Sequence, residues 1–452
     1  MSRFAPLTMF ACTAALLVAG NAAAQLLPSG GLPSVNLPTG NLPTGNLPGG
    51  NAPLLGTVLQ QVLTPSQTRQ LVNPTLDSVG GLPDVAIQAS NPSSLLDLRR
   101  MRLQQMIREN RNQLENDGSG QPVRRGVLVA INPAPSSLQN AAKAGFRTIG
   151  AEPNTDLGFT AVLLAVPNGM SARDGLRRLR QAAPGIEADL DHVFEPAGGD
   201  LMPFVGALAV AAGTGGVRIG IIDGGVGSHP AMAGASIEQR GFSGQPKPTG
   251  HGTAVASLMV GNQGPFRGAA RGASLFVADV YGGNRAAGSA SSVVRALGWL
   301  ASKRPGVINI SLVGPPNVVL ARAIQQVRAR GIQVVAAVGN DGPAAPPQYP
   351  ASYAGVVAVT GVDAGGRALI EAGKASHLDF AAPGADMAAA LPGAGYARVR
   401  GTSFAAPLVS ARLAMSGSAA QLASEARPGK GRVGRGIVCF DCRTDPKLVR
   451  AK

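Results

Sequence analysis

The sequence predicts an α/β protein in which a mostly parallel sheet is covered by helices on both faces and is preceded by a small α+β domain. Two observations carry this prediction. In the second half of the chain, strands that are apolar throughout alternate with helices, as in parallel sheets that are buried on both sides. Ahead of them, residues 124–200 follow the order β-α-β-β-α-β, which is typical of a ferredoxin-like domain.

The first 24 residues have the pattern of a secretory signal peptide. Arg3 supplies the positive charge, Phe10 to Ala19 form a short apolar region, and Ala22-Ala23-Ala24 offers a small-residue cleavage site before Gln25. No later stretch reaches the roughly 18 consecutive apolar residues of a membrane-spanning helix. We therefore expect a protein that is exported to a periplasm or to the exterior, without a transmembrane segment.

Residues 25–123 read as a Pro- and Gly-rich linker that contains one helix. The motifs starting at Asn36, Asn41 and Asn46 repeat with a period of five, and their prolines prevent regular helix or sheet. The spacing of leucine and methionine predicts a helix over Ser94 to Glu115, in which apolar residues alternate with a charged face.

The α+β domain predicted for residues 124–200 has clear element signals and no catalytic cluster. Ser171 and Asp174 mark a helix start, as N-cap and third helical residue. Strands are predicted over Val127–Ile131, Arg147–Ala151, Phe159–Val166 and Ile186–Val193, and helices over Ser136–Ala144 and Ser171–Gln181.

The larger α/β domain is predicted over residues 205–440. Its strands are Val217–Ile222, Ser274–Ala278, Val307–Ser311 and Ile332–Ala337, and its helices are Thr253–Val260, Ser289–Lys303 and Val318–Arg330. In parallel sheets of this kind, ligands bind beyond the carboxyl ends of the strands, so polar residues at those ends are candidate site residues.

Four such residues follow one another along the chain. Asp223 ends the first strand, His251 opens a helix between two glycines, Asn340 ends a later strand, and Ser403 lies in Gly401-Thr402-Ser403-Phe404-Ala405-Ala406-Pro407. Each has an ordinary structural explanation, as a turn aspartate, a turn asparagine or a helix cap. Together, in the order Asp-His-Asn-Ser, they favour nucleophilic catalysis by serine. The glycines after Asp223 do not fit a dinucleotide-binding fingerprint, and Gly-x-Ser-x-Gly of lipase-type hydrolases is absent around Ser403.

These motifs resemble those of the subtilisin-like serine proteases (subtilases, peptidase family S8), over about residues 205–440. The similarity extends to Asn309-Ile310-Ser311-Leu312, Tyr349-Pro350-Ala351-Ser352-Tyr353 and Phe380-Ala381-Ala382-Pro383-Gly384. The resemblance implies a subtilisin-like three-layer fold and a secreted serine endopeptidase. The α+β domain resembles the family's propeptides, which implies an intramolecular inhibitor and self-cleavage within residues 195–212.

The resemblance also implies roles for single residues. Ser403 is the expected nucleophile, His251 the general base and Asp223 the residue that orients it, while Asn340 belongs to the oxyanion hole. A peptide substrate is expected to bind as an added strand along Ser311, Leu312, Val313 and Gly314, where Val313 departs from the glycines frequent in the family. The alternative is a catalytically silent relative that binds peptides or a partner protein.

The remaining signals concern cofactors and partners. Cys439 and Cys442 are spaced C-x-x-C, and neither a second cysteine pair nor adjacent histidines favour zinc. In an exported chain a local disulfide is favoured, and redox catalysis is the alternative. We expect no cofactor; calcium binding is left open, but no strong calcium site is evident, because acidic residues are sparse. The net charge of +15 includes a basic tail over 441–452, but scattered charges without interleaved aromatic residues favour a solvated surface over a nucleic-acid site.

Overall fold

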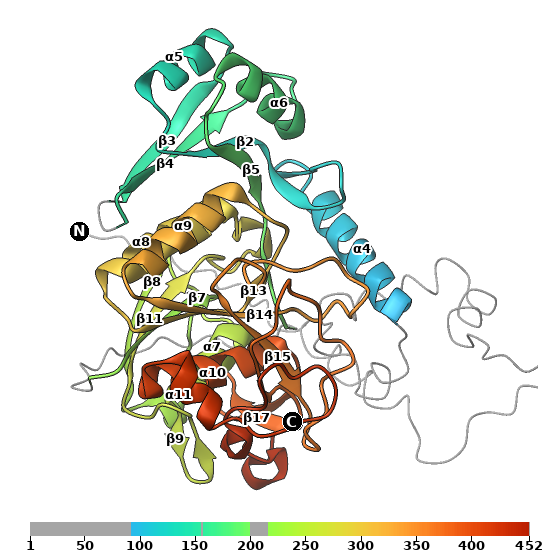
Figure 1. The fold of residues 1–452 in the computed structure, drawn as a ribbon, viewed down its shortest axis with the longest axis vertical. Coiled ribbons are helices and arrows are strands. Elements are labelled where there is room, and N and C mark those ends of the chain that lie inside the picture. The colour runs from blue at the N-terminus through green and yellow to red at the C-terminus, as the bar shows by residue number, and fades with distance from the viewer. Residues whose placement is uncertain (1–91, 155–156, 199–215, 452) are drawn as a thin grey trace, which may run out of the picture. The chain divides into compact units, whose positions relative to one another are not determined.

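The computed structural model describes residues 92–154, 157–198 and 216–451 (Figure 1). The predicted signal peptide, the repeats of residues 25–53 and most of the predicted self-cleavage region lie outside the described residues. Among the described residues, no helix is long and apolar enough to cross a lipid bilayer.

A seven-stranded parallel sheet forms the centre of the peptidase-like domain. Its strand order is β16-β15-β14-β12-β7-β11-β8, with the bounds β7 Arg218–Asp223, β8 Ser236–Gly241, β11 Ser274–Asp279, β12 Val307–Ile310, β14 Gln333–Ala337, β15 Val357–Val362 and β16 Phe380–Pro383. Except for the edge strand β8, these strands are almost entirely buried, which explains why they read as continuous apolar runs rather than alternating ones.

Helices cover both faces of this sheet (Figure 1). On one face, α8 (Ala290–Ser302) and α9 (Val318–Ala329) pack against the sheet through a core of Ile, Val and Leu side chains. On the other face, α7 (Gly250–Val260) and α10 (Thr402–Ser416) form the second core, which includes Phe404. The predicted three-layer α/β fold is therefore confirmed.

The smaller domain is an antiparallel sheet with two helices. Its chain order is β2 (Pro122–Ile131), α5 (Pro135–Lys143), β3 (Arg147–Asn154), β4 (Phe159–Ala165), α6 (Ala172–Ala182) and β5 (Ala188–His192). The strands lie in the order β5-β2-β4-β3, so the predicted ferredoxin-like arrangement is present. Ser171 caps α6, since its side chain accepts from the Asp174 N–H.

The helix predicted over Ser94 to Glu115 is wrong at its C-terminal end. The helix α4 spans Pro92–Glu109, and the residues Leu114–Asn116 instead form strand β1, which pairs antiparallel with β2. Leu114 is fully buried at this edge, so pairing with β2 outweighs the helical periodicity of the sequence.

Short elements complete the fold. They are β6 (Glu195–Pro196), β9 (Asn262–Gln263), β10 (Phe266–Arg267), β13 (Leu312–Val313), β17 (Met387–Ala390), β18 (Tyr396–Val399), α11 (Ala419–Ser424) and the 3-10 turns η1 (Pro230–Met232), η2 (Arg285–Ala287), η3 (Phe440–Cys442) and η4 (Pro446–Val449). The last two turns lie in the basic tail, where Thr444 accepts from the Ala388 N–H and is buried.

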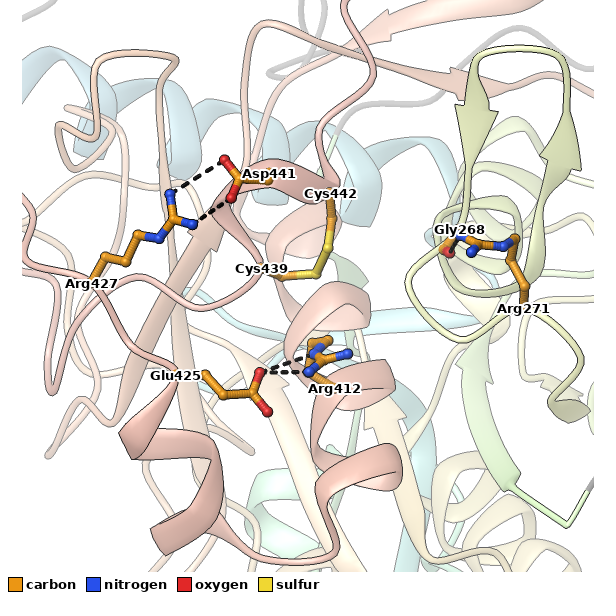
Figure 2. The surroundings of a disulfide bond; sticks show 8 residues. All are labelled: Gly268, Arg271, Arg412, Glu425, Arg427, Cys439, Asp441 and Cys442. Carbon is orange, nitrogen blue, oxygen red and sulfur yellow. Dashed lines mark hydrogen bonds and ion pairs between the residues drawn. A yellow bond between two sulfur atoms is a disulfide. The ribbon is translucent and has the colours of Figure 1, made fainter.

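A disulfide joins Cys439 and Cys442 in this C-terminal segment (Figure 2). Two ion pairs lie near it: Arg427 with Asp441 at 2.5 Å, and Arg412 with Glu425 at 2.7 Å. Ile437, two residues ahead of the disulfide, bridges to Ala381 of β16. The segment after α11 is thus attached to the main sheet and locally cross-linked.

Candidate active site

Asp223 and His251 meet at the carboxyl end of the sheet. Asp223 is the last residue of β7, and His251 is the second residue of α7, whose N-cap Thr249 accepts from the Gly252 N–H. His251 Nδ1 lies 2.8 Å from Asp223 Oδ1, and both side chains are 1% exposed. A buried carboxylate at this distance fixes the orientation of the imidazole and favours the tautomer with a proton on Nδ1.

The glycine after His251 makes this approach possible. A Cβ on Gly252 would overlap the backbone of Gly224, which directly follows Asp223. The first turn of α7 can therefore lie against the end of β7 only if residue 252 has no side chain.

Ser403 is the second residue of α10 and is fully buried. Its Oγ and the Nε2 of His251 have no hydrogen-bond partner among the described residues. Both atoms face the same residue, Gly198: a Cβ built there would overlap Ser403 Oγ and would lie 3.1 Å from His251 Nε2. The hydroxyl and the free imidazole nitrogen thus converge on one point of the backbone, at the junction of Ala197 and Gly198.

The Asn340 side chain lies on the other side of that junction. Its Oδ1 accepts from the Thr402 N–H at 2.9 Å, which turns Nδ2 toward the Ala197 carbonyl, to which it donates a hydrogen bond. Gly401, with φ at +140°, gives the amide room, since a Cβ there would lie 2.7 Å from Asn340 Nδ2. An amide donor on a carbonyl oxygen is the geometry of an oxyanion hole.

A buried network of hydrogen bonds connects the start of α10 to β12 and to the residue that follows it. Ser410 donates to Asn309 Oδ1 at 2.9 Å, Asn309 Nδ2 donates to Ser311 Oγ at 2.9 Å, and Ser311 donates to the Ser403 carbonyl at 3.0 Å. Every member is buried and paired, so the network holds α10 in one position relative to β12.

The segment Phe194–Gly198 occupies the cleft as an added strand. Glu195 and Pro196 pair antiparallel with Val313 and Leu312, and the Ala197 N–H donates to the Ser311 carbonyl at 2.8 Å. A Cβ on Gly314 would lie 2.6 Å from the Phe194 ring. All four residues expected to line the substrate, Ser311 to Gly314, therefore contact this segment.

The Phe194 end of the segment is held from the opposite side. The Phe194 N–H donates to the Gly288 carbonyl at 2.7 Å, and the Tyr281 hydroxyl donates to the Phe194 carbonyl at 3.0 Å. Asp279 fixes the backbone around Tyr281, because its Oδ1 accepts hydrogen bonds from the N–H groups of Tyr281 and Gly282. The segment is thus bonded along both of its edges, as peptides are in β-augmentation.

Asp279 was not among the predicted site residues, although it lies beside Asp223 in register on the neighbouring strand. Burial raises the pKa of the Asp279 carboxyl, the backbone N–H groups that it accepts from oppose this, and the charge of Asp223 adds to the increase. The signal available in the sequence is a carboxylate at the end of an otherwise apolar strand.

Two carboxylates of β5 were also missed by the sequence interpretation. Asp191 accepts from the N–H and the hydroxyl of Ser291, both at 2.8 Å, and Asp189 accepts from the Val318 N–H at 2.8 Å. These donors belong to the first turns of α8 and α9, where unpaired N–H groups and the helix dipole favour negative charge. The smaller domain therefore caps two helices of the larger one.

Comparisons with known proteins agree with this geometry. The model of the family described as "Subtilase family" (Peptidase_S8) matches residues 214–427. Subtilisin Savinase from Lederbergia lenta is 34% identical over 209 residues, 44% of this chain and 76% of that protein. Alkaline protease from Alkalihalobacillus alcalophilus is also 34% identical over 209 residues, and the match covers 53% of its length.

One solved structure shares the fold over most of the chain. Fervidolysin from Fervidobacterium pennivorans, described as a keratinolytic enzyme related to subtilisin, superposes with a TM-score of 0.57 at 19% identity. The superposition covers 73% of this chain and 61% of that one. This superposition shows the fold, and the sequence matches show that the chain belongs to the subtilase family of serine proteases.

Proposed function

We propose that this protein is an exported serine endopeptidase that acts through Asp223, His251 and Ser403, and that its first substrate is its own peptide bond between Ala197 and Gly198. The observation that carries the proposal is the position of that bond. Its carbonyl accepts from Asn340, while Gly198 lies against Ser403 Oγ and His251 Nε2.

The proposed acylation starts with attack of Ser403 Oγ on the carbonyl carbon of Ala197, while His251 Nε2 takes the hydroxyl proton. Asp223 stabilises the imidazolium that forms. The negative charge on the carbonyl oxygen is stabilised by Asn340 Nδ2 and the Ser403 N–H. The C–N bond then breaks, and His251 returns the proton to the departing amine of Gly198.

Deacylation repeats the sequence with water as the nucleophile. His251 removes a proton from the water, which attacks the Ala197 ester, and Ser403 leaves with the proton restored. The products are a carboxylate at Ala197 and a new N-terminus at Gly198. The Phe194–Ala197 segment keeps its strand pairing after the cleavage. It therefore still covers the active site, and the smaller domain acts as a product inhibitor of the enzyme.

The self-cleavage site also suggests a substrate preference. The residue before the bond is alanine, and its side chain is buried in the core that includes Val313 and Phe404. We expect peptides with a small residue at that position to be cleaved best in trans. Export rests on the signal-peptide pattern of residues 1–24.

Replacing Asn340 by alanine is expected to lower kcat by about 10²–10³-fold with little change in KM, because the amide donates mainly to charge that develops in the transition state. Steady-state hydrolysis of a peptide with alanine before the scissile bond measures both constants. A rise in KM at unchanged kcat would instead assign Asn340 to ground-state binding.

A fluorophosphonate probe tests the proposed activity itself. Once the cleaved fragment has left the active site, the processed protein should be labelled, and mass mapping should place the adduct on the tryptic peptide that contains Ser403. Ser416, the last residue of the same helix and outside the buried network, provides the matched comparison: Ser416→Ala should still be labelled, and Ser403→Ala should not. A chain that stays uncleaved and takes up no probe would support the alternative, a catalytically silent relative that binds peptides.

A further inference from the structure

Helix α4, which precedes the smaller domain, carries two arginines on a buried face. Leu95, Arg99, Arg102 and Met106 recur at spacings of four, three and four residues, so they lie on one side of the helix. Arg99 is 7% exposed and the Arg102 side chain is 15% exposed. The buried side of α4 therefore includes two guanidinium groups that are largely covered.

Both arginines contact the residue that follows Asn340. Arg99 Nε lies 2.9 Å from Asp341 Oδ2, and Arg102 Nη2 lies 3.0 Å from Asp341 Oδ1. Asp341 is 4% exposed. A carboxylate so deeply covered needs its cationic partners, and both are supplied by a helix about 240 residues earlier in the chain.

Arg102 also holds the segment in the cleft. Its Nε and Nη2 donate to the two carboxylate oxygens of Glu195, each at 3.2 Å. Glu195 lies two residues before Ala197. A single guanidinium thus joins the inhibitory segment to the wall of the cleft beside Asn340, in the bidentate geometry that arginine forms with carboxylates.

The charges in this cluster balance. Two carboxylates, Glu195 and Asp341, face two guanidinium groups. Burial by itself lowers the pKa of Arg102, but the carboxylates of Glu195 and Asp341 outweigh it and raise the pKa above its usual value. The pairs therefore stay charged over the whole pH range in which the carboxylates are ionised.

Apolar contacts fix α4 at both ends. Leu95 packs on Gly342, where an added Cβ would lie 3.0 Å from its Cδ1. At the other end, Met106 belongs to a buried cluster with Leu114, Val193 and Ala286. The helix is thus attached to both the peptidase domain and the segment that leads into the cleft.

From these contacts we infer that α4 is an autoinhibitory latch, which retains the cleaved segment ending at Ala197 in the cleft through Arg99 and Arg102. The inference rests on the proposed self-cleavage. Cutting the Ala197–Gly198 bond leaves every contact of α4 in place, so the two fragments stay associated until the arginines separate from Asp341. The active site becomes available to other substrates only after that step.

The test compares the full-length chain with Arg99→Ala/Arg102→Ala. Arg108→Ala is the matched control, because Arg108 is an exposed arginine on the same helix. After self-cleavage, size-exclusion chromatography follows whether the two fragments coelute, and hydrolysis of an added peptide follows the appearance of activity. We expect the double variant to be cleaved fully and to gain activity on the order of 30-fold faster or more. Arg108→Ala should behave like wild type.

A second variant covers the case in which the double variant does not fold and therefore fails to cleave itself. Glu195→Gln keeps the shape of the side chain and removes only the charge that Arg102 binds, and it should also release the fragment faster than wild type. Fragment retention and activation rates equal to wild type in a variant that cleaves normally would overturn the latch. Absence of cleavage in the wild-type chain would instead overturn the proposed function.

Discussion

A chain in which alanine replaces Ser403 is expected to remain uncleaved and to lose on the order of 10⁶-fold in kcat. The loss is this large because the proposed mechanism forms the acyl-enzyme on Ser403 Oγ, the hydroxyl oxygen that lies against Gly198. The oxyanion hole and the strand pairing of the substrate remain, so substrate binding should survive.

N-terminal sequencing and intact mass measure this outcome directly. The processed wild-type protein should begin at Gly198, and the Ser403→Ala chain should keep its upstream residues. Ser416→Ala serves as the control for a lost hydroxyl in α10, because Ser416 is the last residue of the helix and lies outside the buried network. A fully active wild-type protein that begins at Gln25 would contradict self-cleavage, and cleavage of Ser403→Ala at the same bond would contradict the role of Ser403.

Replacing Asp223 by asparagine is expected to lower kcat by about 10⁴-fold while leaving the fold intact. The asparagine amide can donate a hydrogen bond to His251 Nδ1, and the imidazole proton would then sit on Nε2. In the proposed mechanism Nε2 must be unprotonated, because it accepts the proton of the Ser403 hydroxyl. The contact of 2.8 Å between residue 223 and His251 Nδ1 would be kept, but the imidazole would have the wrong tautomer.

Asp279→Asn is the matched comparison for this variant. Asp279 lies beside Asp223 on the neighbouring strand, but it accepts hydrogen bonds from backbone N–H groups and not from His251. Its loss in kcat should be much smaller. Peptide hydrolysis by both variants, with circular dichroism to check the fold, decides the point. Equal losses would mean that general disturbance of the strand ends, and not the His251 tautomer, limits the rate.

Much of the fold was predictable because the pattern and the environment agree. Strands β7, β11, β12 and β14 lie within one or two residues of their predicted ranges, since both of their faces are buried and only apolar residues suit them. The end of α4 was not predictable in this way. Leu114 continues the helical spacing, yet it belongs to a strand whose partner β2 lies several residues further along the chain.

The residues of the candidate site also fall into two groups, those with a local sequence signal and those without one. Asp223, His251, Asn340 and Ser403 were found because each stands at a strand end or helix start with small neighbours, a local feature that the sequence displays. Asp189, Asp191 and Asp341 look like ordinary surface carboxylates in the sequence. Their partners are Ser291, Val318 and the α4 arginines, about 100 residues or more away, so only folding reveals what they bind.

By itself, the sequence determined the α/β class, the ferredoxin-like domain and the four polar residues gathered at one edge of the sheet, because these depend on periodicity and on local turn chemistry. Tertiary structure alone decided which bond lies in the cleft and which charges hold it there. Ala197 meets Asn340, and Arg102 meets Glu195, only when elements distant in the chain are packed together. The spacing of residues along the chain does not reveal such contacts, because the partners are far apart in the sequence and meet only in the folded protein.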